Sequence, residues 1–164
     1  MQEPVADDGA APQPLIGRAA WQQALRALLA EPGPECCLYS DRFEDWPLDE
    51  PAVVEALAAW ALTRPRSCMR MLARGYADLC SRAPRFVRWR MDFGHVLECR
   101  ELPAEVLAPP EGLWLRERAL VALPAQNQRR ARMLDPARRL ATLQDFDQAW
   151  ELGQAGFVPE ILGL

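Results

Sequence analysis

The chain has 164 residues, half of them hydrophobic and six of them tryptophan, so it is long and apolar enough to bury a core of its own. No apolar run approaches the roughly 20 residues that a membrane-spanning helix needs, and we expect no membrane association. The net charge of −4 argues against a general nucleic-acid binder, which would normally be basic. Lysine is absent, and arginines outnumber acids in residues 60–100 and 116–139, which suggests a local anion-binding face.

The first 14 residues differ from the rest because they mix proline, glycine, alanine and acids without any period. We therefore predict a flexible tail over residues 1–14 and a single domain over residues 15–164. The tail lacks the basic and apolar regions of a secretory signal, so we expect a cytoplasmic protein. The five cysteines contain no C-x-x-C pair, which argues against a zinc knuckle or a redox site. Adjacent Cys36 and Cys37 should point to opposite faces of a strand as small buried hydrophobes.

The first two thirds of the domain alternate helical periodicity with short apolar segments bounded by turn residues. In chain order these patterns predict a helix over 15–31, a strand over 35–40, a helix over 51–62 opened by Pro51, a strand over 68–73, an amphipathic segment over 76–87 that Pro84 splits into two short helices, and a strand over 95–102.

From Leu113 onward the period changes to that of short strands. Strands are predicted over 113–115, 119–123 and 131–134, followed by a helix that starts at Asp135-Pro136 and stops at Gly153. The apolar tail over 157–164 should pack back onto the body. The order of elements predicts an α/β fold: a single mixed, mainly parallel sheet with helices on both faces, extended by antiparallel strands.

This order resembles the phospholipase D-like fold over residues 15–155. The strand ECCLYS, the loop DRFEDWPLDE, the helix PAVVEALAAWAL and the strand CMRMLAR carry the resemblance. The segments PRFVRWR and DFDQAWELGQAGF are similar to an uncharacterised group of bacterial phospholipase D-like domains. The resemblance implies the scaffold and, because related one-domain members commonly pair across their active faces, a possible homodimer.

Active members of that family use a H-x-K-x-x-x-x-D motif, in which the histidine attacks phosphorus and the lysine holds a phosphate oxygen. Aligning the hairpin by its turn places Pro110, Gly112 and Glu117 at the three motif positions, and Pro124-Ala125 where a Gly-Ser turn would lie. With no lysine and a single histidine at residue 95, the resemblance implies a degenerate domain without phosphodiesterase activity by that route.

Ligands of open α/β sheets bind at the carboxyl edge of the parallel strands. Ser40 and Asp41 follow the first predicted strand, and Arg74 and Tyr76 follow the second, so these four should share that edge. Arg130 adds charge from the second basic block. These five residues form our predicted ligand-binding set.

Three other groups have a plainer interpretation. The acidic loop residues Asp41, Glu44, Asp45 and Asp49 favour a solvated loop over a magnesium site. The arginines over 82–90, interleaved with Phe86 and Trp89, favour a solvated helix face over a single-strand nucleic-acid surface. His95 and Cys99 lie about 13 Å apart on a strand, too far to share a metal, so His95 should be structural.

We therefore expect a non-catalytic domain that binds a phosphate-bearing or other anionic ligand at the carboxyl edge, with no cofactor and no metal. Two alternatives stay open. The chain could be a protein-interaction or dimerisation module whose arginines only solvate it. Less favoured is an enzyme that uses acidic residues and a metal.

Overall fold

The computed structural model describes residues 13–64, 66–125 and 127–157. Its helices are α1 (Arg18–Leu29), α2 (Pro51–Thr63), α3 (Ala77–Arg82), α4 (Pro84–Asp92) and α5 (Pro136–Leu152). Its strands are β1 (Leu15–Ile16), β2 (Glu35–Tyr39), β3 (Cys68–Ala73), β4 (Leu97–Glu101), β5 (Gly112–Leu115), β6 (Ala119–Leu123), β7 (Arg130–Met133) and β8 (Gln154–Ala155). Within the described ranges, no helix combines the length and apolar composition that a membrane crossing requires.

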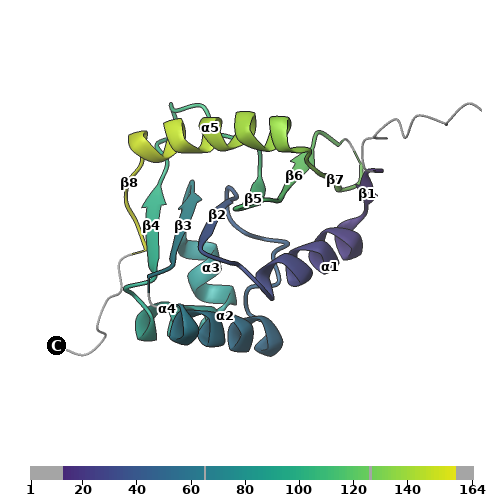
Figure 1. Cartoon of the computed structure of the whole chain (residues 1–164). Coiled ribbons are helices and arrows are strands. Elements are labelled where there is room, and N and C mark those ends of the chain that lie inside the picture. The colour runs from purple at the N-terminus through teal and green to yellow at the C-terminus, as the bar shows by residue number, and fades with distance from the viewer. Residues whose placement is uncertain (1–12, 65, 126, 158–164) are drawn as a thin grey trace, which may run out of the picture.

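The strands form one eight-stranded sheet in the order β1-β7-β6-β5-β2-β3-β4-β8. Figure 1 shows three layers, with α5 on one face of the sheet and α1 to α4 on the other. The predicted α/β fold with one mixed sheet and helices on both faces is confirmed.

The parallel part of the sheet is smaller than the predicted "mainly parallel" arrangement. The β2–β3 and β3–β4 pairs are parallel, whereas the other pairs are antiparallel. The reason lies in the connections, because parallel neighbours need a long crossover and short turns give hairpins. Residues 116–118 are too few for a crossover, so β5 and β6 form a hairpin and set the direction of that half of the sheet.

Two cores lie on the two faces of the sheet. Side chains from α1 to α4 and the inner positions of the strands form the larger one, and α5 covers a smaller one that contains Trp114, Phe146 and Trp150. Cys36 belongs to the larger core and Cys37 to the smaller, as the alternation of strand side chains predicts. Both thiols are free and buried, and burial raises the pKa of Cys37 to about 11.

Local sequence signals place several element ends where they were predicted. Pro51 stands in the first turn of α2, and Ala83-Pro84 separates α3 from α4. The carboxylate of Asp135 accepts a hydrogen bond of 2.8 Å from the backbone N–H of Arg138 and so caps α5.

Other boundaries differ from the prediction. The first helix starts at Arg18, because Leu15–Ile16 pairs with β7 and Gly17, at φ +96°, turns the chain from this short strand into α1. The strand predicted from residue 95 starts at Leu97. The predicted flexible tail lies almost entirely outside the described residues. Of the predicted C-terminal packing only Phe157 can be judged, and its ring stacks on Tyr76 with centroids 5.2 Å apart.

Candidate functional site

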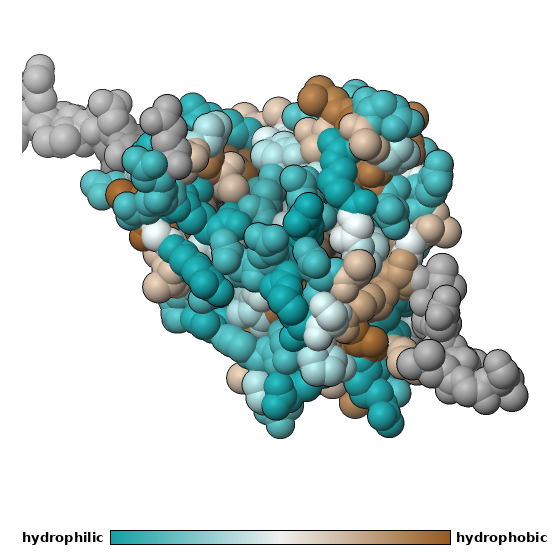
Figure 2. Space-filling view, turned by 180° about the vertical axis from the view of Figure 1, so that it is seen from behind, coloured by the Kyte–Doolittle hydropathy of each residue, from teal (hydrophilic) through white to brown (hydrophobic). Residues whose placement is uncertain are grey.

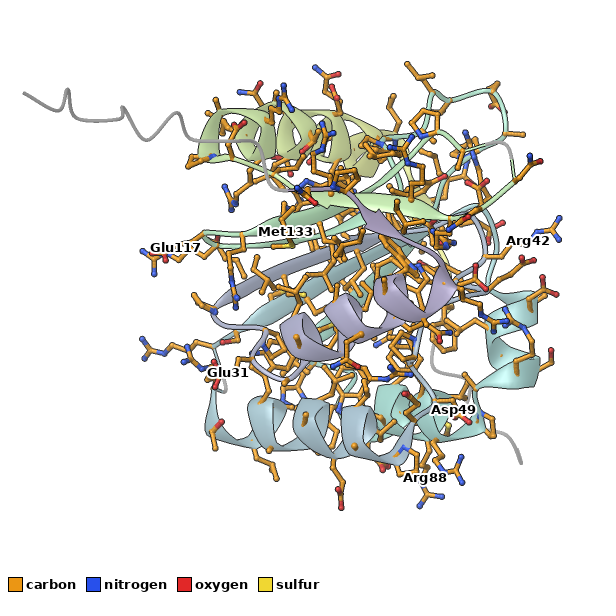
Figure 3. The ribbon with its side chains drawn as sticks, turned by 90° about the vertical axis from the view of Figure 1, so that its right-hand side faces the viewer. Glu31, Arg42, Asp49, Arg88, Glu117 and Met133 are labelled. Carbon is orange, nitrogen blue, oxygen red and sulfur yellow. The ribbon has the colours of Figure 1, made fainter. Side chains whose placement is uncertain are left out.

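A cleft of about 550 Å³ lies at the carboxyl edge of β2. Its lining comes from three segments that the sheet brings together: the loop after β2, the loop before β5 and the residue before β7. These residues are Tyr39, Ser40, Asp41, Arg42, Glu44, Ala108, Pro109, Glu111 and Arg129. Figure 3 shows Arg42 at this end of the sheet and Glu117, in the β5–β6 turn, at the opposite end. Figure 2 views the molecule from the side on which Arg42 and the carboxyl edge lie, and hydrophilic side chains cover the centre of that side.

Glu111 is the centre of a hydrogen-bonded network inside the cleft. One carboxylate oxygen accepts bonds from the hydroxyl of Ser40 at 2.6 Å and from the indole N–H of Trp46 at 3.0 Å. The other oxygen accepts from the guanidinium of Arg129 at 2.5 Å. The Ser40 hydroxyl also accepts the backbone N–H of Phe43 at 2.9 Å, so it ties the loop after β2 to the loop before β5. Ser40 therefore lies at the predicted edge, but its polar contacts are made within the protein.

Arg129 is held from three sides. It donates to Glu111, and its Nε donates to Asp45 at 3.1 Å. Its guanidinium carbon lies 4.5 Å from the centre of the Trp21 ring, which is a cation–π contact. Burial by itself would lower the pKa of Arg129, but the two carboxylates outweigh it and the net pKa is raised. The guanidinium of Arg129 therefore makes its hydrogen bonds with two carboxylates of the protein itself, those of Asp45 and Glu111.

Asp41 and Arg74 meet beside this network. The phenol of Tyr39 donates to Asp41 at 2.5 Å, and burial together with this carboxylate raises the pKa of Tyr39. Arg74 donates to the carbonyl of Pro103, and its Nε lies 4.0 Å from Asp41. The structure thus brings together Ser40, Asp41 and Arg74 from the predicted set.

Arg42 and Arg74 line a second, shallower depression of about 410 Å³ with Gly75, Ala77 and Asp78. The ion pairs of Arg42 are long, at 3.7 Å to Asp78 and 3.9 Å to Glu44, and its side chain is 66% exposed. The guanidinium of Arg42 is therefore more loosely held than that of Arg129, whereas Arg74 is fixed in part by its hydrogen bond to the Pro103 carbonyl.

The other two predicted ligand residues lie elsewhere. Tyr76 is buried, and its hydroxyl lies 2.9 and 2.8 Å from the backbone carbonyls of Met71 and Arg100, which share its single proton. It follows β3 in sequence but turns into the core. Arg130 is exposed on β7 and pairs with Ile16 of β1, so it does not line the cleft. Its neighbour Arg129 does.

The candidates on α4 and at His95 lie away from this cleft, although Arg90 and His95 line another pocket of about 730 Å³. The buried aromatics Phe86 and Trp89 leave α4 without an exposed stacking surface, and Arg90 donates inward to backbone carbonyls. His95 is exposed at the amino end of β4, the edge opposite the cleft. Among the residues that the structure describes, no group of three or more His, Cys, Asp or Glu side chains is arranged to hold a metal ion.

The position aligned with the family's lysine is crowded. A Cβ on Gly112 would lie 2.6 Å from the backbone carbonyl of Leu120 and 3.2 Å from the Trp114 ring. A side chain at this position would force the β5–β6 hairpin to shift. The residues missing from the predicted set are Arg42, Glu111, Arg129 and Trp46. The only signal for Glu111 was a carboxylate between Pro109-Pro110 and a strand.

Many solved structures have a similar fold, among them the following three. The structure described as that of TrmBL2, an archaeal chromatin protein with a novel mode of DNA binding, gives a TM-score of 0.65 at 17% identity, over 93% of this chain and 56% of that one. Nuc from Salmonella typhimurium, a phospholipase D family member, gives 0.57 at 13% identity, over 88% and 97%. Phosphatidylserine synthase from Haemophilus influenzae gives 0.53 at 12% identity, over 88% and 39%.

At these identities the likeness establishes the fold alone, and the chain spans only about half of the archaeal protein. The expected phospholipase D-like fold is confirmed. No curated protein matches the sequence. The family described as "Domain of unknown function (DUF7931)" matches residues 17–157, so the chain belongs to this family.

Proposed function

We propose that this chain is a non-catalytic phospholipase D-like domain that binds a phosphate-bearing or similar small anion at the carboxyl edge of its sheet, through Arg42 and Arg74. The observation that carries the proposal is the difference between the arginines at this edge. Arg129 is fixed by two carboxylates, whereas Arg42 and Arg74 line one depression and their ion pairs measure 3.7–4.0 Å.

Three features support the absence of catalysis. The chain has no lysine, and its only histidine lies at the far edge of the sheet. Gly112 leaves no room for a side chain at the aligned lysine position. The charged side chains of Glu111 and Arg129 in the cleft are bonded to each other. We expect no hydrolysis of bis(p-nitrophenyl) phosphate above the buffer rate, and hydrolysis that Arg74→Gln abolishes would overturn this part of the proposal.

The ligand chemistry follows from the two guanidiniums and their neighbours. Guanidiniums are planar, forked donors that match phosphate oxygens. The carboxylates of Asp41, Glu44 and Asp78 lie around the same depression and would repel a weak monoanion. These carboxylates repel a dianion as well, so the case for a phosphate group rests on its several acceptor oxygens, which can bond both forked guanidiniums at once.

A thermal-shift experiment tests the proposal. Inorganic phosphate, a phosphate monoester and a short oligonucleotide are each titrated at low and high salt against the wild type, Arg42→Gln, Arg74→Gln and Arg88→Gln. A ligand at 100 times its Kd adds about 2.7 kcal/mol of stability. Because Arg74 also bonds the Pro103 carbonyl, each variant is compared with its own ligand-free melting temperature.

We expect a salt-sensitive shift that Arg42→Gln and Arg74→Gln reduce and that the control Arg88→Gln keeps. Arg88 is a fair control because it is 78% exposed and, among the described residues, forms an ion pair only with Asp92 on its own helix. No shift with any anion, or an equal shift in all three variants, contradicts anion binding at this edge. A shift with the oligonucleotide alone would redirect the proposal to nucleic acid, the ligand class that the archaeal chromatin protein's description suggests.

A second candidate, the interaction or dimerisation module, is favoured by one side chain. Leu107, in the loop between β4 and β5, is 90% exposed beside two residues of the cleft wall, Ala108 and Pro109. Burying a leucine against a partner contributes about 1.5–3 kcal/mol. A solution mass above 18.5 kDa that Leu107→Asp returns to the monomer value would favour this candidate. A monomer at all concentrations would rule out the homodimer.

A further inference from the structure

A pocket of about 480 Å³ lies at the amino edge of the sheet, between β2, β3, β5 and α5. We propose that this amino-edge pocket binds a small organic oxyanion with a flat apolar body, a carboxylate or a phosphate monoester. It is a second site, distinct from the carboxyl-edge depression, because β2 runs between the two for about 16 Å. Its volume lies within the range of small-molecule sites.

Three arginines from three different elements line this pocket. Arg66 precedes β3, Arg70 lies within β3, and Arg139 lies on α5. Two carboxylates, Glu35 and Asp147, face them, so the lining carries one net positive charge. By contrast, the lining of the carboxyl-edge cleft holds two arginines and three carboxylates.

Contacts within the protein hold the guanidiniums of Arg70 and Arg139 in place. Some of their N–H groups make no hydrogen bond within the described residues. Arg139 directs Nε and one terminal nitrogen to the single carbonyl of Leu115, at 2.8 and 2.5 Å. Arg70 lies over the rings of Phe146 and Trp150, at 5.1 and 5.5 Å, and only its Nη2 makes hydrogen bonds within the described residues. A preorganised guanidinium with free N–H groups is the arrangement that recognises a carboxylate or phosphate.

The thiol beside Arg70 does not add negative charge. Arg70 donates to the sulfur of Cys37 at 3.2 Å and to Asp147 at 2.9 Å. Because burial raises the pKa of Cys37 to about 11, this thiol is neutral at physiological pH. The pocket therefore keeps its positive balance.

The walls fit an apolar body. Arg139, Leu143 and Asp147 are spaced four residues apart, so they form one stripe of α5 that faces the sheet. Opposite them, Trp114 of β5 pairs in register with Cys37 of β2. Trp114 is buried under the pocket and gives its indole N–H to Thr142 at 2.9 Å, so the accessible apolar surface comes from Pro34 and Leu143. An anion without an apolar part, such as inorganic phosphate, would make no contact with this apolar surface.

An alkylation-protection experiment on the full chain tests the inference. Cys68 lines the pocket and is exposed, whereas Cys80 is exposed on α3 and does not line it, so the chain contains its own control. The protein is treated with iodoacetamide, and the modification of each cysteine is followed by mass spectrometry. The probes are 2-naphthoate, 2-naphthyl phosphate, the neutral 2-naphthalenemethanol and inorganic phosphate.

We expect one naphthyl anion to slow modification of Cys68 at least fivefold in a saturable manner, with the rate at Cys80 unchanged. The naphthoate and naphthyl phosphate arms distinguish the two oxyanions. Arg139→Gln and Arg66→Gln should each raise the concentration for half-protection about tenfold. Arg138→Gln, an exposed neighbour on α5 that pairs with Asp135, and Arg74→Gln, at the opposite edge, should leave it unchanged.

Several results would overturn the inference. These are an unchanged Cys68 rate with both anions at millimolar concentration, equal protection by the neutral alcohol, or protection that persists in the Arg66→Gln/Arg139→Gln double variant. Arg66 lies on an exposed segment outside the core. Arg66→Gln therefore tests the inference even if Arg139→Gln destabilises the fold. The Arg74→Gln arm also separates this site from the one proposed above.

Discussion

The pair of Glu111 and Arg129 offers a quantitative test of how the cleft is built. If the network is structural, replacing either partner should destabilise the fold, and replacing both should cost less than the sum. We choose Glu111→Gln and Arg129→Gln, because glutamine keeps most of the side-chain volume and removes the charge. The double variant completes a double-mutant cycle.

The magnitude follows from burial and from the number of bonds. The side chains of Glu111 and Arg129 are only 21% and 20% exposed, and Glu111 accepts three hydrogen bonds. Removing one partner of a fully buried pair costs about 3–5 kcal/mol. After a discount for the exposed fifth, and because Asp45 still pairs with Arg129, we expect each single variant to lose about 2 kcal/mol. The coupling energy should be about 1–2 kcal/mol.

Urea denaturation followed by tryptophan fluorescence measures these free energies of unfolding, with the requirement that the m-value stays constant. A loss of 2 kcal/mol should also lower Tm by about 4–8 °C in a chain of this size. The exposed pair of Arg88 and Asp92 is the control, and its cycle should give only about 0.3–0.5 kcal/mol. A coupling below about 0.5 kcal/mol for Glu111 and Arg129 would refute the reasoning and would make both side chains available to a ligand.

Three further predictions concern stability. Gly112→Ala should cost about 1–3 kcal/mol by urea denaturation, since its Cβ would meet the carbonyl of Leu120 at 2.6 Å; a neutral effect would show that the hairpin shifts freely. Asp135→Ala should lose about 1 kcal/mol with the cap of α5, whereas Asp135→Asn should keep most of it; equal losses would contradict capping. The folded pKa of Cys37 is raised to about 11 from an ordinary value of 9.0, so the unfolded chain releases this proton first. Stability from this thiol is therefore complete below pH 9 and lost between pH 9 and 11, by up to about 3 kcal/mol, and Cys37→Ala should flatten the curve there; an unchanged slope would refute it.

Much of the fold could be predicted because its signals are local. Apolar periodicity, Pro51, Pro84 and the Asp135 cap each act within a few residues, and they placed α2, the α3–α4 break and α5. The two-residue strands β1 and β8 could not be predicted, because two residues carry no periodicity. They are strands only because β7 and β4 offer backbone partners.

The positions of the candidate site residues were likewise predicted only in part. The rule that ligand residues follow parallel strands correctly placed Ser40, Asp41 and Arg74 on one edge. It failed for Tyr76, whose hydroxyl finds two backbone carbonyls in the core, because side-chain direction after a strand depends on packing.

By itself, the sequence determined the α/β class, the separation of Cys36 and Cys37 onto opposite faces, and the absence of lysine. The tertiary structure decided which charges meet. Glu111 lies 71 residues from Ser40 and 18 from Arg129, and only the sheet order β7-β6-β5-β2 brings their segments together. Whether an arginine is available to a ligand depends on the carboxylates beside it in space. Composition records that the charges exist, but ion pairing falls off within a few ångströms, so only the fold determines which of them are neutralised.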